Sequence, residues 1–385
     1  QRVLLGHRDF AAPVVAELEG YGIHSEQAGE LTALFNTNQV VVEHRFFNDS
    51  RPEGATPWEC LTLKNAATDQ HRIIQALREK VYPGTRWIST GISKGGQTVV
   101  YHRYFFPEDV EVSVPYVAPI NLEYIDPRLE KFLDKLGNTP ESKDLLGEGG
   151  MEQKWQIFDF QKRCFERLAD LQPLFNALAE KNGYTFERAG GLEMALKMVI
   201  LEFPFSFWQW GNDINDMPEE GVDTIEEWFQ YLVRVSPPDF FSDKSIENLQ
   251  AFYYAALTET GMYAYNVRPF KKYFPKIKKQ ITFRYALPKG YENVGFNAEQ
   301  LAAIGQWLQT DASRILFIYG GIDPWTATAA ELGGNTKCEK YMKADGCHLT
   351  RINSFEGMTR DVIIETLKEW IYDIPAEEDT EEAVY

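Results

Sequence analysis

Hydrophobic residues in the first 120 positions follow two alternating patterns. Four short apolar runs have the length of β-strands: residues 3–5, 13–18, 40–43 and 86–90. Between the last two runs, apolar residues recur at helical spacing and share one face: Leu63, Ala67, Ile74 and Leu77. Strands that alternate with amphipathic helices predict a parallel sheet covered by helices on both faces.

The middle of the chain has a different pattern. Residues 121–310 show long helical periodicities rich in charged and aromatic residues, and an apolar run at 315–319 then restores the strand signal. We therefore expect an α/β core formed by residues 1–120 and 311–375, with a mainly helical lid inserted at 121–310. The acidic segment 376–385 is expected to be a solvated chain end.

Composition and charge exclude several classes of function. The chain has 385 residues, 44% of them hydrophobic, and its 39 Lys and Arg against 57 Asp and Glu give a net charge of −18. Such a surface repels phosphate backbones and anionic lipids, so we expect no nucleic-acid partner. The longest run without Asp, Glu, Lys or Arg spans residues 31–42, which is shorter than the roughly 18 apolar residues of a membrane-spanning helix.

The cysteines give no sign of a metal site or a disulfide scaffold. Cys338 and Cys347 are near enough in sequence to pair, but two ordinary buried thiols are the favoured interpretation. We therefore predict no metal and no cofactor. Because a strand pattern follows almost directly after Gln1, we expect that a leader or a first strand has been removed from the chain.

The segment Gly91-Ile92-Ser93-Lys94-Gly95 carries the strongest chemical signal. It lies between a predicted strand and a predicted helix, which is the context of a G-x-S-x-G nucleophile elbow. Glycine on either side of the serine avoids collisions in so sharp a turn. A loop serine in a glycine-rich turn is the alternative for the motif alone, whereas a phosphate loop is excluded because no G-K-[ST] follows.

A serine hydroxyl needs a base to take its proton and an acid to hold that base. Asp323 follows the apolar run 315–319, at the carboxyl end of a predicted strand, where catalytic groups gather in α/β sheets. His348 lies in a loop before the last helix, and the other five histidines all precede the lid. The order Ser93, Asp323, His348 is that of α/β hydrolases, so we predict a catalytic triad.

The oxyanion of a tetrahedral intermediate also needs hydrogen-bond donors. The backbone N–H of Lys94 is built into the elbow. For the second donor we favour the amide of Gly20 or Tyr21, at the end of an early strand, with the Tyr21 phenol as a further possibility. A plain glycine turn is the alternative interpretation of this segment.

Five segments together resemble a known family: Val42-Glu43-His44-Arg45-Phe46-Phe47, Thr90-Gly91-Ile92-Ser93-Lys94-Gly95-Gly96, Phe105-Phe106-Pro107-Glu108-Asp109-Val110, Tyr116-Val117-Ala118-Pro119 and Asp323-Pro324-Trp325. The chain resembles serine peptidase family thirty-seven, the secreted bacterial tripeptidyl aminopeptidases. This family is similar to the Pro-Xaa carboxypeptidase and dipeptidyl peptidase II family. The resemblance implies an α/β-hydrolase fold, the same Ser93, Asp323 and His348 triad, a peptide substrate and a periplasmic or secreted location.

An exopeptidase that acts from the amino end needs an anion for the substrate ammonium. Glu259 and Glu202 lie among aromatic residues and are the candidates, although each could be an ordinary paired glutamate. The aromatic run 202–210, with Trp208 and Trp210, either lines a pocket for peptide side chains or packs the core of the lid.

We therefore expect a serine exopeptidase that releases short peptides, tripeptides by the resemblance, through an acyl-enzyme. A carboxypeptidase or carboxylesterase could use the same triad. A non-catalytic peptide-binding protein on a hydrolase scaffold is the alternative of another class, and it would be expected to lack a triad residue. The sequence does not indicate an oligomeric state.

Overall fold

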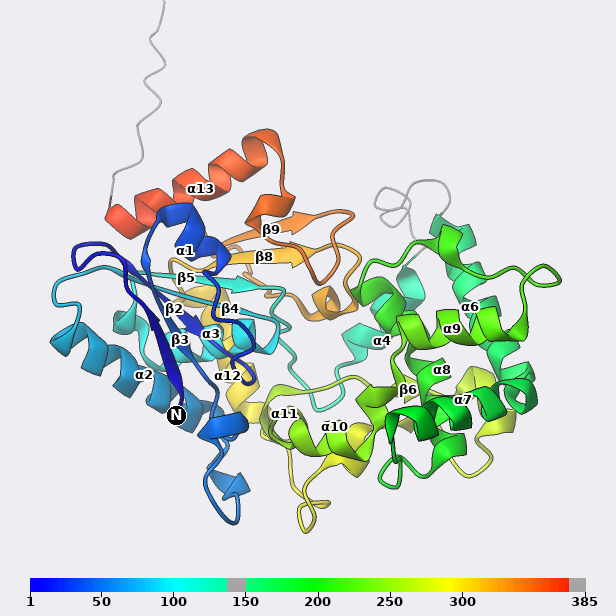
Figure 1. Cartoon of the computed structure of the whole chain (residues 1–385). Coiled ribbons are helices and arrows are strands. Elements are labelled where there is room, and N and C mark those ends of the chain that lie inside the picture. The colour runs from blue at the N-terminus through cyan, green and yellow to red at the C-terminus, as the bar shows by residue number, and fades with distance from the viewer. Residues whose placement is uncertain (137–149, 374–385) are drawn as a thin grey trace, which may run out of the picture.

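A seven-stranded sheet organises one half of the molecule, shown on the left of Figure 1. This computed structural model describes residues 1–136 and 150–373. The strands run in the order β1-β3-β2-β4-β5-β8-β9. Their bounds are β1 Val3–Gly6, β2 Val14–Leu18, β3 Asn38–Val42, β4 Trp87–Ile92, β5 Val112–Tyr116, β8 Leu316–Gly320 and β9 Glu339–Lys343.

All pairs in this sheet are parallel except β1 with β3. The register pairs Glu17 of β2 with Thr90 of β4, and Ile92 of β4 with Tyr116 of β5. The parallel strands therefore end along one edge of the sheet. The loops that follow β2, β4 and β8 leave from this edge, so they are placed close together.

Helices cover both faces of the sheet. Alternate residues of β2 point to opposite faces: Val14 and Ala16 pack with α2 and α3, whereas Val15 packs with α1 and α13. The bounds of these helices are α1 Glu30–Phe35, α2 Leu63–Lys80, α3 Lys94–Phe105 and α13 Gly357–Tyr372. This arrangement is the α/β-hydrolase fold, which confirms the fold predicted from the sequence.

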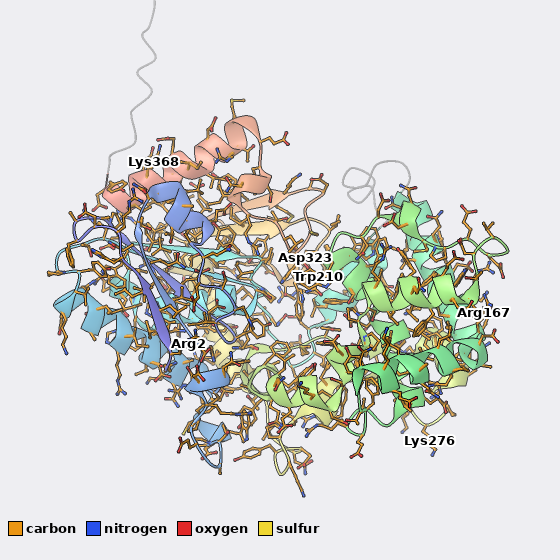
Figure 2. All side chains as sticks on the ribbon, viewed as in Figure 1. Arg2, Arg167, Trp210, Lys276, Asp323 and Lys368 are labelled. Carbon is orange, nitrogen blue, oxygen red and sulfur yellow. The ribbon has the colours of Figure 1, made fainter. Side chains whose placement is uncertain are left out.

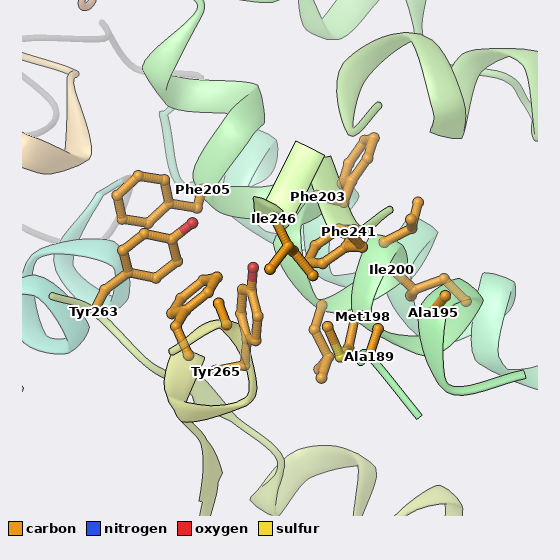
Figure 3. Packing of buried hydrophobic residues seen from close by; sticks show 14 of the residues in the cluster. Ala189, Ala195, Met198, Ile200, Phe203, Phe205, Phe241, Ile246, Tyr263 and Tyr265 are labelled. Carbon is orange, nitrogen blue, oxygen red and sulfur yellow. The ribbon is translucent and has the colours of Figure 1, made fainter. Parts of the chain in front are cut away.

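The second half of the molecule is a helical insertion between β5 and β8, shown on the right of Figure 1. Its helices are α4 Pro127–Lys135, α6 Gly150–Glu166, α7 Leu168–Asn182, α8 Leu192–Gln209, α9 Ile225–Val235, α10 Asp243–Asn248 and α11 Gln250–Ala255. Strands β6 Tyr265–Asn266 and β7 Gln280–Ile281 pair antiparallel as a separate two-stranded sheet. Figure 3 shows Phe205, Tyr263 and Tyr265 inside the aromatic core of this insertion.

Helix α12 (Ala298–Thr310) packs on the sheet rather than within the insertion. Leu301, Ile304 and Leu308 share one apolar cluster with Phe317 and Tyr319 of β8. We therefore propose that the insertion ends before α12, earlier than the boundary at residue 310 that helical periodicity suggested. The acidic segment 376–385 lies outside the described residues.

Candidate active site

Ser93 occupies the turn between β4 and α3. Its backbone has φ 58° and ψ −120°, a conformation that is uncommon for a residue other than glycine. The turn is held by the Ser93 N–H, which donates to the Tyr116 carbonyl at 2.9 Å, and by the Gln97 N–H, which donates to the Ser93 carbonyl at 3.0 Å. This strained turn from strand to helix is the geometry that a nucleophile elbow requires.

The glycines beside Ser93 are required by close packing. A Cβ on Gly91 would lie 2.5 Å from the Gly95 carbonyl carbon and 2.7 Å from the Leu18 carbonyl oxygen. A Cβ on Gly95 would lie 2.9 Å from the same Leu18 oxygen. Side chains at either position would therefore push α3 away from the end of β2 and open the elbow.

Asp323 and His348 meet through the two loops that follow β8 and β9. Both side chains are buried, and Asp323 Oδ2 lies 2.6 Å from His348 Nδ1. Asp323 Oδ1 also accepts the Trp325 N–H at 3.1 Å, which fixes the carboxylate. Because Nδ1 is occupied by the carboxylate, Nε2 is the ring nitrogen left to interact with a nucleophile.

The loop that carries His348 also contacts the insertion. The His348 N–H donates to the carbonyl of Gln209 at 2.9 Å, at the last residue of α8. The next residue, Trp210, is 47% exposed, and its ring centroid lies 5.8 Å from that of His348. Figure 2 shows Asp323 and Trp210 next to each other where the core meets the insertion.

The turn after β2 lies directly against the elbow. A Cβ on Gly20 would lie 2.4 Å from the Gly95 nitrogen and 2.7 Å from the Lys94 Cβ, so only glycine fits there. Within the described residues, the N–H groups of Gly20 and Tyr21 donate no hydrogen bond. The turn thus leaves two backbone donors unused beside the start of α3, where the Lys94 N–H has no helical partner either.

The Tyr21 side chain also faces Ser93. Burial raises the pKa of Tyr21 to about 12, and the nearby Ser93 side chain partly offsets that rise. The phenol therefore stays protonated at neutral pH and keeps an O–H to donate. The phenol of Tyr21 therefore lies near the serine, and its amide belongs to the turn that packs against Lys94 and Gly95.

A cavity of about 210 Å³ lies within the insertion. Its aromatic lining includes Phe158, Phe205, Trp208, Tyr263 and Tyr265, and Asp126 and Glu130 add carboxylates. Phe205 and Tyr263 also contact Trp325, which lies in the loop after β8. Their ring centroids lie 5.2 and 5.4 Å, respectively, from that of Trp325. The cavity therefore shares a wall with the loop that carries Asp323.

Glu202 is a buried carboxylate with several hydroxyl donors. Its Oε1 accepts the Ser206 hydroxyl at 2.7 Å, and its Oε2 accepts the hydroxyls of Tyr263 and Tyr265 at 2.8 and 2.7 Å. Burial raises the pKa of Glu202 to about 7, and these hydrogen bonds limit the rise. In this arrangement the carboxylate fixes two tyrosines of the cavity wall.

Glu259 lies elsewhere, against the start of α2, where it lines a small cavity together with Lys94. It belongs to the π-helix Ala256–Thr260, and its Oε2 accepts the Leu63 N–H at 3.0 Å, at the first residue of α2. Burial raises its pKa, against the effect of the Leu63 N–H. Within the described residues, no hydrogen bond joins Glu259 or Glu202 to Ser93, Asp323 or His348.

The remaining expectations concern metals, cysteines and the membrane. All four cysteines are free, and Cys338 is buried. Across residues 1–136 and 150–373 no group of His, Cys, Asp and Glu is arranged to hold a metal ion. In the same ranges no helix combines the length and apolar character needed to span a bilayer.

A family model described as PS-10 peptidase S37 matches residues 1–368. The chain belongs to this peptidase family. The S37 family assignment confirms the resemblance drawn from the five sequence segments. The chain is also 31% identical over 339 residues to the prolyl tri/tetrapeptidyl aminopeptidase of Streptomyces mobaraensis, covering 86% of this chain and 67% of that protein.

Solved structures with a similar path of the chain have lower sequence identity to this S37 peptidase than that aminopeptidase has. The proline iminopeptidase of Mycobacterium smegmatis is 12% identical, with 96% of this chain and 95% of that chain covered and a TM-score of 0.44. The enol-lactonase of Burkholderia xenovorans LB400 is 14% identical, with 96% of each chain covered and a TM-score of 0.39. The fold assignment therefore rests on the strand order and the elbow of this chain.

Proposed function

We propose that the protein is a serine exopeptidase that releases short peptides from free amino termini. The observation that carries the proposal is the 2.6 Å contact of His348 with Asp323, together with Ser93 in the strained turn after β4. Membership of a peptidase family and similarity to a tri/tetrapeptidyl aminopeptidase support the direction of cleavage.

In the proposed mechanism, Ser93 Oγ attacks the scissile carbonyl while His348 Nε2 takes its proton. Asp323 holds the imidazole through Nδ1 and stabilises the imidazolium that forms. The tetrahedral oxyanion accepts the N–H of Lys94 and a donor of the Gly20–Tyr21 turn. His348 then gives the proton to the leaving amine, which leaves an acyl-enzyme on Ser93. Water, activated by His348, hydrolyses it.

The insertion is proposed to bind the amino-terminal part of the peptide. Trp210 stands beside His348, and Trp208 lines the aromatic cavity, so both are proposed to contact substrate side chains. For the substrate ammonium, Glu259 and Glu202 remain the sequence-based candidates. Glu202 would have to release hydroxyl partners to bind it. Glu130, which lines the cavity and accepts the Asn266 amide at 2.9 Å, is a third candidate.

The test is the analysis of products from a set of defined peptides by mass spectrometry. Each peptide is offered with a free amino end, with an acetylated amino end and with an amidated carboxyl end. Loss of a charge-assisted contact worth about 1.5–3 kcal/mol makes acetylated peptides at least about tenfold poorer substrates. Amidation of the carboxyl end should change the rate little, and tripeptides should be the main products.

Three outcomes would contradict the proposal. Equal cleavage of free and acetylated peptides would favour an esterase or another peptidase specificity. Loss of activity on amidation would identify a carboxypeptidase. Absence of turnover with all peptides and esters would favour a peptide-binding protein. Among Glu259→Gln, Glu202→Gln and Glu130→Gln, the change that removes the preference for free amino ends identifies the ammonium site.

We also propose that the protein acts outside the cytoplasm, in the periplasm or the medium. The family resemblance is the basis of this proposal. The free cysteines favour neither compartment. Fractionation of cells of the source organism, followed by detection with an antibody, tests it. Recovery of the protein only with cytoplasmic markers would contradict it.

A further inference from the structure

The side chain of Lys94 turns beneath the elbow instead of reaching solvent. The residue is 4% exposed, and its Nζ donates a hydrogen bond to the Gly20 carbonyl at 2.7 Å. Burying an ammonium is costly unless it is paired or hydrogen-bonded. Within the described residues, Lys94 forms no salt bridge with a carboxylate. The Gly20 carbonyl is therefore the hydrogen-bond partner that offsets the burial of its ammonium.

Two aromatic rings complete the surroundings of this ammonium. Nζ lies 5.9 Å from the centroid of the Tyr21 ring and 5.6 Å from that of Phe47. These rings are 5.8 Å apart, and Phe252 of the insertion contacts Tyr21 from another side at 5.7 Å. The faces of aromatic rings attract a cation, so the charged form of Lys94 also attracts the Tyr21 ring.

The orientation of one peptide unit follows from these contacts. In a trans peptide the carbonyl of Gly20 and the N–H of Tyr21 point in opposite directions. The Gly20 carbonyl points to Lys94 Nζ, and the Tyr21 carbonyl accepts the His44 N–H at 3.0 Å. Both carbonyls of the turn are therefore fixed, and the Tyr21 N–H is left without an acceptor among the described residues.

We propose that the Lys94 side chain is a positioning residue for the oxyanion site. By binding the Gly20 carbonyl and the Tyr21 ring, it aims the Tyr21 N–H at the oxyanion formed on Ser93, while the Lys94 backbone N–H supplies the other donor. The inference rests on the proposed role of Ser93 as nucleophile. It assigns a second function to the residue that follows the nucleophile, separate from its backbone donor.

The charged and titratable groups around Lys94 come from several elements. Glu19 attracts the ammonium, His44 lines the same small cavity, and Tyr101 and Glu259 face it from α3 and the π-helix. Burial lowers the pKa of Lys94 to about 7, and Glu19 opposes that change. The contact with Gly20 persists on either side of this pKa because the neutral amine also donates N–H.

The experiment compares Lys94→Met with Thr90→Val. Methionine has a similar length but no donor, whereas Thr90→Val removes a buried hydroxyl that donates to the Val114 carbonyl at 2.8 Å on the strand entering the elbow. The readouts are the rate constant of inactivation by a fluorophosphonate, the affinity for a peptide boronate, and kcat and KM. Thermal unfolding of each variant measures the purely structural effect.

We expect Lys94→Met to lower kcat, the inactivation rate constant and the boronate affinity at least tenfold, with KM changed by less than about threefold. Loss of one oxyanion donor costs about 100- to 1,000-fold in kcat, so partial misplacement should fall below that limit. Thr90→Val should lower the melting temperature but leave the inactivation rate near wild type. Unchanged rates in folded Lys94→Met would overturn the proposal.

Two further variants keep the proposal testable if Lys94→Met does not fold. Lys94→Gln is one bond too short to reach the unshifted Gly20 carbonyl, so the same tenfold loss is expected, and a wild-type rate would overturn the proposal. Lys94→Arg retains a donor of sufficient reach and should restore the rate to within a few fold. Fluorophosphonate inactivation needs no peptide specificity, so these results stand even if the exopeptidase assignment fails.

Discussion

His348 is held from two directions: its imidazole Nδ1 lies 2.6 Å from the Asp323 carboxylate, and its backbone N–H donates to the Gln209 carbonyl at 2.9 Å. The first contact comes from the α/β core and the second from the insertion. His348 is therefore positioned by both halves of the molecule. The loop that carries His348 also packs closely on the end of β8, just before Asp323. A Cβ on Gly320 would lie only 2.3 Å from the Cys347 carbonyl oxygen.

Replacement of the nucleophile gives the first prediction. Ser93→Ala should abolish peptide turnover and fluorophosphonate labelling, since removal of a triad serine costs on the order of a million-fold in kcat. Labelling is measured by mass spectrometry of the intact protein. Ser89→Ala is the matched control, because Ser89 lies on β4, the strand that leads into Ser93. Its buried hydroxyl contacts that of Ser113 on β5 at 2.9 Å. Labelling of Ser93→Ala at the wild-type rate would exclude Ser93 as the nucleophile.

A second prediction concerns the acid. Asp323→Asn keeps the size of the side chain but removes the charge that stabilises the imidazolium and selects its tautomer, so kcat should fall by about 10⁴-fold. Steady-state kinetics on a tripeptide substrate measures the change. Asp345→Asn serves as control, because Asp345 lies in the same loop as His348 but pairs with Lys343. An equal loss in both variants would show that the loop, and not the acid, was affected.

The exposed Trp210 ring beside His348 gives a third prediction. Trp210→Ala should lower kcat/KM at least about tenfold, because a large aromatic surface next to the reacting bond is lost, and should change the melting temperature little. Phe10→Ala removes an exposed ring ahead of β2, at the opposite end of the strands, and should leave kcat/KM unchanged. A kcat/KM of wild-type size in Trp210→Ala would remove this ring from the substrate site.

The raised pKa of Glu202 gives a prediction about stability. Its pKa is about 7 in the folded chain against 4.5 for an unperturbed glutamate, so the folded state binds the proton more tightly. The stabilisation is complete below about pH 4.5 and is lost as the pH rises through 7. At 1.36 kcal/mol per pKa unit, about 3 kcal/mol of the free energy of unfolding should disappear across this range.

Glu202→Gln should remove that dependence, since its amide oxygen still accepts the tyrosine hydroxyls. Urea unfolding at pH 5 and pH 8 gives the free energies to compare. Glu193→Gln, on the exposed side of the same helix, should keep the wild-type difference between the two pH values. If Glu202→Gln also keeps it, the carboxyl group is not the source of the effect.

The elbow and the sheet could be predicted because their signals are local. Gly91, Ser93 and Gly95 lie between a strand pattern and a helix pattern, and the strained turn follows directly from that context. Asp323 and His348 are far apart in sequence, but each follows a strand of the sheet. A parallel sheet brings such loops to the same edge, so their meeting could also be predicted.

Other features depend on packing that no local pattern reports. Helical periodicity assigned α12 to the insertion, but periodicity does not tell which surface an apolar face covers. Nor did the aromatic run around Glu202 indicate that Tyr263 and Tyr265 would occupy the carboxylate. The Lys94 side chain was missed as well. The G-x-S-x-G motif constrains only the glycines and the serine, so it gave no signal for the position of this lysine side chain.

The hydrogen bond from His348 to Gln209 constrains how this peptidase can be altered. Its acceptor is a main-chain carbonyl, so the side chain at position 209 is free to vary as long as α8 ends there. Substitutions in the insertion could therefore change the lining of its aromatic cavity without moving His348. Shortening α8 by one turn, or grafting an insertion from another hydrolase, would instead leave the His348 loop without its anchor. Designs that exchange the insertion should preserve the end of that helix before any side chain.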